Sequence, residues 1–282
     1  MIAIESATKP ELPLDMSDQP DQNTHVPVAG RQRGTYMGFA RTLATIAFVI
    51  ALPIALVTSN IRILANAPAV YSYAFDRYNA EDSTGLSRAD LDSTASALRQ
   101  YFNNNETTFY HTVTEGGLTE PVFNARETRH MEDVKRLFVW ANRAQEVSIV
   151  YVLLYVVALF VWLKDSDVRQ LAMQSIVGLG LGVLAIGGIG IFAAFGFDAA
   201  FTRYHELLFT NDFWQLDPAT DHLVQMFPEG FWRDAAIGLG AMCAIEAALI
   251  GGISTIYLLA TRGERRRLTA SVDVAASRTQ AA

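Results

Sequence analysis

Cysteine is almost absent from this chain of 282 residues, in which Cys243 is the only one. A single thiol excludes an intrachain disulfide, and because Cys243 lies inside a long apolar run, we expect no cysteine nucleophile in an aqueous part of the protein. An excess of positive charge is absent as well. The formal net charge of −7 excludes a polybasic nucleic-acid binder, so we expect no nucleic-acid partner.

Several motifs for catalysis or cofactor binding are also missing. The chain has no Gly-x-Ser-x-Gly sequence, which excludes the nucleophile elbow of α/β-hydrolases. Glu127-x-x-His130 is half of a di-iron motif, without the second Glu-x-x-His, and His130-x-Glu132 lacks the Pro-Cys-x-x-Cys of zinc deaminases. The glycines between Gly178 and Gly190 follow no strand, so they indicate close helix packing and no dinucleotide-binding loop. We therefore expect neither a metal nor an organic cofactor.

Apolar sequence, by contrast, is abundant. Hydrophobic residues make up 51% of the chain and the mean hydropathy is +0.19, although 18% of residues are charged. Four stretches are long enough to cross the roughly 30 Å hydrocarbon core of a bilayer. They are residues 36–57, 148–163, 171–195 and 235–260. Since the second stretch is short, its helix should begin before Ser148. The sequence thus predicts an α-helical polytopic membrane protein with four transmembrane helices.

Basic residues on the short flanks of the spans predict the orientation, because they resist transfer across the membrane. One side carries Arg31, Arg33, Lys164, Arg169, Arg262, Arg265, Arg266 and Arg267. The loop between the third and fourth spans carries only Arg203 and Arg233. Both termini are therefore expected to be cytoplasmic. A cleavable signal peptide fits the first span less well, because a polar tail precedes it and its apolar run exceeds the usual length of about 7 to 15 residues.

The predicted four-helix membrane domain, residues 35–262, lies between two polar tails. Residues 1–34 and 263–282 have the composition of disordered cytoplasmic tails. Within the membrane domain, residues 59–145 are numerous enough to form a small extracytoplasmic α+β head. Residues 196–234 form a second external loop, which is strongly aromatic.

Helix and strand signals recur along the head. A helix is predicted at residues 88–102 with Ser87 as its N-cap. β-Branched and aromatic residues predict strands at 107–114 and 121–123 on either side of a glycine pair. Another helix should begin near Asn124 and continue directly into the second span, which would fix the side chains of its first turns above the bilayer.

The aromatic loop is expected to be helical and to lie along the membrane surface. Asp217-Pro218 and Phe227-Pro228 are both helix-start signals. Aromatic residues typical of an interfacial belt are Phe213, Trp214, Phe227, Phe231 and Trp232. In the fourth span, Glu246 is costly in hydrocarbon, and we expect it to be protonated and hydrogen-bonded to the third span.

Two histidines next to the predicted spans are the best candidates for chemistry, because an imidazole titrates near pH 6.5 and can move protons at neutral pH. Glu127 and Asp133 lie three residues on either side of His130, so both carboxylates fall within about 60° of it around a helix. One of them could accept the Nδ1 proton and leave Nε2 free as a base. A solvated run of alternating charges would give the same pattern.

The second histidine, His205, belongs to an apolar helical stripe with Phe197, Phe201, Tyr204 and Leu208. Burial disfavours the charged form of an imidazole, so His205 should be neutral and able to accept a proton at cellular pH. A histidine satisfied by hydrogen bonds in a core is the alternative explanation. The other histidines, including His111 and His222, have no comparable setting.

With both motifs in place, the chain resembles the four-span bacterial lipoprotein intramolecular transacylases. The similarity covers residues 36–262 and excludes both tails. It is carried by Glu127, His130, Met131, Asp133 and Val134 and then by Phe201, His205, Phe209, Asn211, Asp212, Trp214, Asp217, Pro218, Phe227, Pro228 and Phe231.

The resemblance implies a bacterial plasma-membrane acyltransferase that acts on a diacylated lipoprotein. It would move an acyl chain from the diacylglyceryl group to the N-terminal cysteine amine and so make a lyso-form lipoprotein. The two functional histidines of the family correspond to His130 and His205. Membrane lipids are the other implied partner, and the oligomeric state is not predicted.

This reaction needs few groups from the protein. One imidazole removes the proton released when the amine attacks the ester, and the other protonates the departing glycerol oxygen. We expect His130 to be the base and His205 the acid, although the two roles are interchangeable at this point. Arg203, Tyr204 or Asn211 could stabilise the oxyanion. Since amine and ester belong to one molecule, proximity supplies much of the rate, and direct transfer without an acyl-enzyme is expected.

Two other functions are compatible with the sequence. The first is a non-catalytic membrane anchor whose head and aromatic loop bind a lipid or a lipoprotein. The second is a metal or haem protein that uses the two histidines as ligands.

Overall fold

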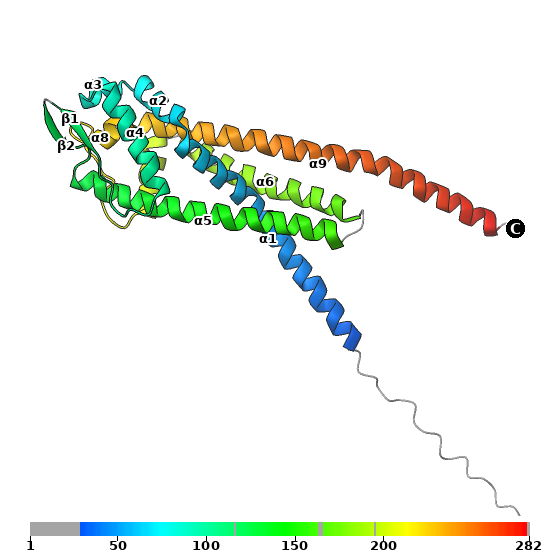
Figure 1. Ribbon diagram of the computed structural model, residues 1–282. Helices are drawn as coiled ribbons and strands as arrows, with labels where there is room; N and C mark the ends of the chain where they lie inside the picture. Colours follow the sequence, from blue (N-terminus) through cyan, green and yellow to red (C-terminus); the bar gives the residue numbers. More distant parts are fainter. Residues whose placement is uncertain (1–28, 116, 163–165, 195, 281–282) are drawn as a thin grey trace, which may run out of the picture. The chain divides into compact units, whose positions relative to one another are not determined.

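The computed structural model describes residues 29–115, 117–162, 166–194 and 196–280 (Figure 1). The chain divides into two units, Met1–Thr42 and Leu43–Ala282. In the first unit, the described residues form the beginning of helix α1 (Ala29–Asn66). Most of the predicted N-terminal tail, residues 1–28, lies outside the described residues, whereas residues 29–34 are helical.

Four helices are long and apolar enough to cross a membrane, which confirms the predicted spans. They are α1, α5 (Ala125–Trp162), α6 (Ser166–Ala194) and α9 (Glu229–Gln280), with candidate spans Gly38–Asn66, Ala125–Val161, Val168–Gly188 and Glu229–Gly263. As predicted, the second helix begins well before Ser148. A disordered tail was predicted after residue 262, but in the structure α9 continues to Gln280. The Ala, Ser and Arg residues of this segment tolerate a helix, and no proline interrupts it.

Helix α5 has a polar half and an apolar half. Its charged residues all lie at or before Glu146, and none occurs from Val147 to Trp162. About 20 apolar residues suffice to cross a bilayer, so a helix of this length has turns to spare. The membrane-crossing part of α5 is therefore its C-terminal half, and its first turns project beyond the hydrocarbon.

Between the spans, small residues allow close approach. A Cβ atom added at Gly178 of α6 would lie 2.8 Å from Val49 O of α1, and one added at Gly182 would lie 2.8 Å from Pro53 Cβ. Gly180 has no atom within 4 Å of such a Cβ. The predicted role of these glycines is therefore confirmed at two positions, where α1 leaves no space for a side chain.

Glu246 of α9 is hydrogen-bonded to the first span. Asn60 Nδ2 of α1 donates to Glu246 Oε2 at 2.8 Å and to Cys243 Sγ at 3.4 Å. The predicted partner in the third span is therefore wrong, because α1 places its fully buried Asn60 beside α9 at this level.

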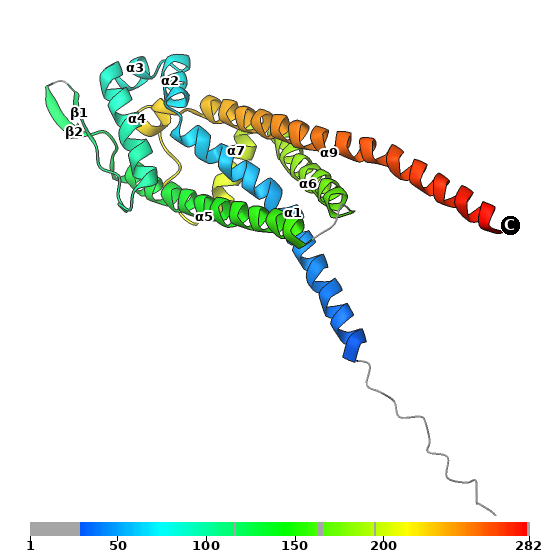
Figure 2. The same cartoon turned by 45° about the vertical axis from the view of Figure 1, so that its right-hand side comes forward.

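Apart from α7 (Phe197–Leu208), the remaining elements gather near the beginnings of α5 and α9 (Figures 1 and 2). They are α2 (Pro68–Arg77), α3 (Ala80–Thr84), α4 (Arg88–Asn103), β1 (Thr112–Glu115), β2 (Leu118–Pro121) and α8 (His222–Met226). We call this part the head. It is α+β, as predicted from the sequence.

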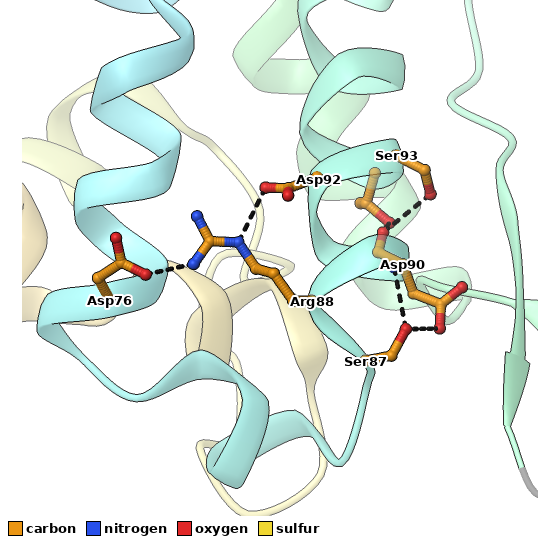
Figure 3. Close-up of polar contacts among 7 residues, drawn as sticks. Asp76, Ser87, Arg88, Asp90, Asp92 and Ser93 are labelled. Atoms are coloured by element: carbon orange, nitrogen blue, oxygen red, sulfur yellow. Dashed lines mark hydrogen bonds and ion pairs between the residues drawn. The ribbon is translucent and has the colours of Figure 1, made fainter.

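Helix α4 begins where the sequence predicted. Ser87 Oγ accepts a hydrogen bond from Asp90 N at 3.2 Å and so caps the first turn. Arg88 bonds Asp76 of α2 and, at 3.0 Å, Asp92 of α4, which ties the two helices together on the surface of the head (Figure 3).

The two strands form an antiparallel hairpin in which Thr114 pairs with Thr119. Gly117 has φ 87°, in the left-handed region that favours glycine, and supports the tight turn. The predicted turn is therefore confirmed, but the strand bounds are shifted. β1 begins at Thr112 and not at 107, and β2 ends at Pro121, where the second predicted strand was to begin.

Aromatic side chains of the second loop fill the core of the head. Phe227 and Phe231 are buried, and Phe227 contacts the rings of Tyr71 and Phe75 at 5.8 Å between centroids. The predicted interfacial belt is therefore wrong for these two residues, because α8 and the start of α9 pack into the head. Phe213 and Trp232 are exposed, whereas Trp214 is half-buried.

The two predicted helix starts in this loop have different outcomes. Helix α9 begins at Glu229, directly after Phe227-Pro228, as predicted. Asp217-Pro218 begins only a turn, closed by Asp221 N donating to Asp217 O at 2.8 Å, and α8 begins later at His222.

Candidate active site

The two candidate histidines come together from α5 and from α7 (Phe197–Leu208). The ring centroids of His130 and His205 are 5.9 Å apart, and only 8% and 6% of the two residues is exposed. At this separation the two rings contact each other, and little of either is open to solvent. The structure thus brings together two residues that lie 75 positions apart in the sequence.

His205 is oriented by its own helix. Its Nδ1 lies 2.7 Å from the carbonyl oxygen of Phe201, one turn earlier. Since a carbonyl oxygen only accepts, Nδ1 must carry the proton and donate it. In the neutral ring, Nε2 then has a free lone pair, which makes it the basic atom.

His130 has a different setting, because its Nδ1 is buried and has no hydrogen-bond partner among the described residues. Burial, followed by the electrostatic effect of His205, lowers the pKa of His130 to about 4. Burial also lowers the pKa of His205, against the opposing effect of the hydrogen bond to Phe201. Both imidazoles are therefore neutral at neutral pH, as expected for His205 from its apolar stripe.

Glu127 does not orient His130 and instead builds the start of α5. Its Oε2 accepts from Asn124 N at 2.7 Å, while Asn124 Oδ1 accepts from Glu127 N at 3.0 Å. This reciprocal pair is a capping box. The other oxygen, Oε1, accepts from Leu223 N at 2.6 Å and fastens α8 to α5. The expectation that Glu127 accepts the Nδ1 proton of His130 is therefore wrong, since both of its oxygens are occupied elsewhere.

Asp133 is likewise occupied. Its Oδ2 accepts from Asn211 Nδ2 at 2.8 Å, and its Oδ1 pairs with Arg136. Nearby, Arg126 donates to the carbonyl oxygen of Asp212 at 2.6 Å. These contacts attach the segment after α7 to the first turns of α5. Asp133 thus positions a loop, and this contact occupies one of the two amide N–H groups of Asn211.

Of the other two predicted oxyanion donors, Arg203 is engaged in an ion pair on the surface. It pairs with Glu206 at 2.6 Å, and 76% of its side chain is exposed. Tyr204 remains close to the pair, with its ring edge-on to that of His205 at 5.2 Å between centroids. Tyr204 is therefore the best placed of the three candidates.

Aromatic rings enclose the histidine pair. Trp214 stacks on His205 with centroids 4.9 Å apart and planes inclined by 29°. Phe209 lies edge-on to His130 at 5.3 Å and also contacts His205 at 5.6 Å, and Phe201 covers another side of His205 at 4.3 Å. These rings exclude water, which explains the lowered pKa values.

Of these aromatic residues, the sequence placed Phe201 beside His205 in the apolar stripe, but it gave Phe209, Trp214 and Asn124 no role at the site. The capping box was readable as Asn124-x-x-Glu127 immediately before a helix. Nothing in the local sequence indicates that Trp214 stacks on an imidazole. Among the described residues, no three His, Cys, Asp or Glu side chains gather as metal ligands.

Fold and site together define a four-span membrane protein with a buried histidine pair and a small α+β head. The family model of the lipoprotein intramolecular transacylase Lit matches residues 46–232, most of this membrane domain. The chain belongs to this family and is therefore an acyltransferase, a lipoprotein intramolecular transacylase.

Solved structures of the membrane-integral lipoprotein intramolecular transacylase from Bacillus cereus share the fold. One has a TM-score of 0.63 and 18% identity over 80% of this chain and 99% of that chain. In two variants, one histidine is replaced by arginine or by alanine. Their TM-scores are both 0.64, with identities of 17% and 16% over 86% and 82% of this chain and 100% and 99% of theirs. No curated protein matches the chain.

Proposed function

We propose that His130 and His205 catalyse acyl transfer within a diacylated bacterial lipoprotein, from its diacylglyceryl group to its N-terminal cysteine amine. The product is the lyso-form lipoprotein. The observation that carries this proposal is the contact between the two buried, neutral imidazoles. A neutral imidazole pair can accept one proton and deliver it nearby, which is the net proton movement that aminolysis of an ester requires.

His205 is the base in this mechanism. Its Nδ1–H is held by the carbonyl oxygen of Phe201, so Nε2 takes the proton from the attacking amine. The same carbonyl then stabilises the imidazolium through its hydrogen bond, and the face of Trp214 adds a cation–π contact. This assignment reverses the expectation from sequence, in which His130 was the base.

His130 is the acid partner. As the tetrahedral intermediate collapses, the carbon–oxygen bond to glycerol breaks and the leaving oxygen needs a proton. His130 delivers this proton to the leaving oxygen. The proton that His205 took from the amine then passes to His130, whose ring centroid is 5.9 Å away, and replaces the one delivered. Neither ring needs to be protonated before the substrate binds, which is consistent with the lowered pKa of both.

Tyr204 is the candidate for oxyanion stabilisation, because it is the one predicted donor that touches the pair without a competing ionic partner. A hydroxyl donor aimed at the developing oxyanion is typically worth a factor of about 10² to 10³ in rate. The amine and the ester belong to one substrate molecule, so proximity reduces what the protein itself must supply.

Transfer proceeds directly, without an acyl-enzyme. Neither histidine of the pair is hydrogen-bonded to a hydroxyl or thiol in the described part of the chain. Cys243 is bonded to Asn60 in the membrane-spanning region and not to a histidine. A nucleophile activated by an adjacent base is the usual signature of a covalent mechanism, and the pair has none.

The substrate is anchored in the outer leaflet of a bacterial plasma membrane, and we place the head and the histidine pair on that side. Both termini are then cytoplasmic. The basic flanks of the spans support this orientation.

The test is mass spectrometry of lipoprotein N-termini after reaction with the purified protein. His205→Gln and His130→Gln should each slow formation of the lyso-form by at least about 10²-fold. His111→Gln is the matched control, since His111 bonds Ser93 at 3.0 Å outside the pair, and it should retain the natural rate. Natural rates in both variants of the pair, or an acyl group trapped covalently on the protein, would contradict the mechanism.

A further inference from the structure

Helix α7 follows the third span almost directly. Helix α6 ends at Ala194 and α7 begins at Phe197, and the two helices pack against each other. Helix α7 also contacts α9, another membrane-crossing helix. The element that carries His205 therefore begins where the chain leaves the bilayer.

The outer surface of α7 is unusually apolar on one side. Leu207 is 84% exposed, Tyr204 51% and Leu208 41%. We call these three residues the entry face. Around the helix they span roughly 100°, whereas the Arg203–Glu206 ion pair lies on the neighbouring side. In water, such a cluster of exposed apolar side chains would be costly.

Helix α6, which precedes α7, also exposes apolar side chains. Leu184 and Ile191 of α6 are 73% and 63% exposed, as expected for side chains that contact acyl chains. Since only two residues separate α6 from α7, the entry face lies close to the end of this membrane-crossing helix. Its occupant is therefore the acyl-chain region of the membrane, and the exposed ion pair faces the headgroups and water.

His205 lies next to this face on the same helix. At about 100° per residue, His205 is roughly 60° from Leu208 around the helix axis. The ring of Tyr204 touches that of His205 at 5.2 Å between centroids. A group that moves sideways out of the acyl chains therefore passes Tyr204 and Leu208 before it meets the imidazole.

We propose that the entry face immerses α7 in the outer leaflet and is the lateral route by which the acylated glyceryl group of the substrate reaches His205 from the bilayer. This rests on the proposed function for the identity of the substrate. The contact with lipid, however, can be measured without any reaction.

The first experiment locates α7 in the membrane. In a Cys243→Ser background, a bimane label is placed at Leu207→Cys or, as the control on the opposite side of the helix, at Thr202→Cys. Each protein is reconstituted in vesicles of phosphatidylcholine and phosphatidylglycerol with either ordinary or brominated acyl chains. The label at 207 should lose fluorescence in brominated vesicles while the label at 202 keeps it. Equal quenching of both labels, or none at 207, would overturn the proposal.

The second experiment tests the route. With a lipoprotein substrate in the same vesicles, Leu207→Glu should raise KM about tenfold, the effect of losing the burial of one leucine, and the change should appear mainly in KM. Thr202→Glu adds the same charge on the polar side and should keep the natural kinetics. If quenching at 207 is observed but the two variants have equal KM, the route is wrong. If the natural protein transfers no acyl chain, the proposed function fails while the quenching result still stands.

Discussion

At the scale of single residues, the histidine pair is a source of both reactivity and instability. Two imidazoles are buried among aromatic rings, where His130 is held neutral with a pKa lowered to about 4. In the unfolded chain the same ring titrates near 6.5. Between these values the unfolded state binds more protons than the folded state, so acid favours unfolding.

This difference predicts how stability depends on pH. The contribution of His130 is fully present above about pH 6.5 and is lost as the pH falls towards about 4. The melting temperature in detergent should therefore fall between pH 7 and pH 5, and His130→Asn should reduce that fall. His111→Asn is the control and should keep the natural slope. Identical slopes in all three proteins would show that folding does not lower the pKa of His130.

Glu127 gives a second prediction at this scale. In Glu127→Gln one carboxylate oxygen that accepts from Asn124 N or Leu223 N becomes an amide donor, so one backbone N–H loses its partner. This should destabilise the protein by about 1–3 kcal/mol. Thermal unfolding measures the loss, and Glu120→Gln on exposed β2 should have little effect. At low temperature the folded variant should keep its kcat. If Glu127 oriented His130, the same substitution would lower kcat.

The sequence identified the right histidines but not all of their neighbours. Helical spacing places Glu127 and Asp133 on the same side of α5 as His130, which is correct geometrically. What spacing cannot show is which groups other elements bring to those carboxylates. Leu223 N and Asn211 Nδ2 come from segments 96 and 78 residues further along the chain and donate to these carboxylates. The hydrogen bond from His205 to Phe201, in contrast, is local to one helix turn.

At the scale of whole elements, α6 approaches α1 closely at the position of Gly178. Gly178→Ala would place a Cβ 2.8 Å from Val49 O, a backbone atom that cannot move aside alone. The helices must separate, at a cost of about 1–3 kcal/mol. Gly180→Ala meets no atom within 4 Å and should be neutral or stabilising, because alanine favours a helix over glycine by up to about 1 kcal/mol.

Thermal unfolding of the two variants in the same detergent checks this prediction. Gly178→Ala should melt below the natural protein and Gly180→Ala at or above it. If both melt alike, the close packing of α6 on α1 is not the reason for glycine at position 178.

Elements with strong local signals were predictable, and those set by tertiary packing were not. The four spans, the Ser87 cap of α4 and the start of α9 after Pro228 all follow from periodicity, capping and proline chemistry. The bounds of β1 and β2 could not be predicted in this way, because a two-stranded hairpin is short and its ends depend on the elements packed around it. Phe227 and Phe231 are residue types typical of an interfacial belt, yet they are buried in the core of the head. Their position depends on how α8 packs, which the local sequence does not show.

At the scale of the whole molecule, the head and the far end of α9 should lie on opposite sides of the membrane. Asp234, near the start of α9, accepts hydrogen bonds at 2.7 Å from Tyr73 and Tyr78 of the head region. From Asp234 to Arg262 the helix is continuous and rises about 42 Å, enough to cross the hydrocarbon core of roughly 30 Å. A substrate anchored in the outer leaflet requires the head to be on the outer side.

Cysteine labelling in cells tests this orientation. In the Cys243→Ser background, Leu118→Cys on the exposed hairpin should react with a membrane-impermeant maleimide in intact spheroplasts. Arg262→Cys should react only after lysis, because a side chain on the cytoplasmic side is shielded by the bilayer. The Cys243→Ser protein without an added cysteine measures the background labelling. Labelling of Arg262→Cys but not Leu118→Cys in intact spheroplasts would place the histidine pair on the cytoplasmic side, away from any lipoprotein in the outer leaflet.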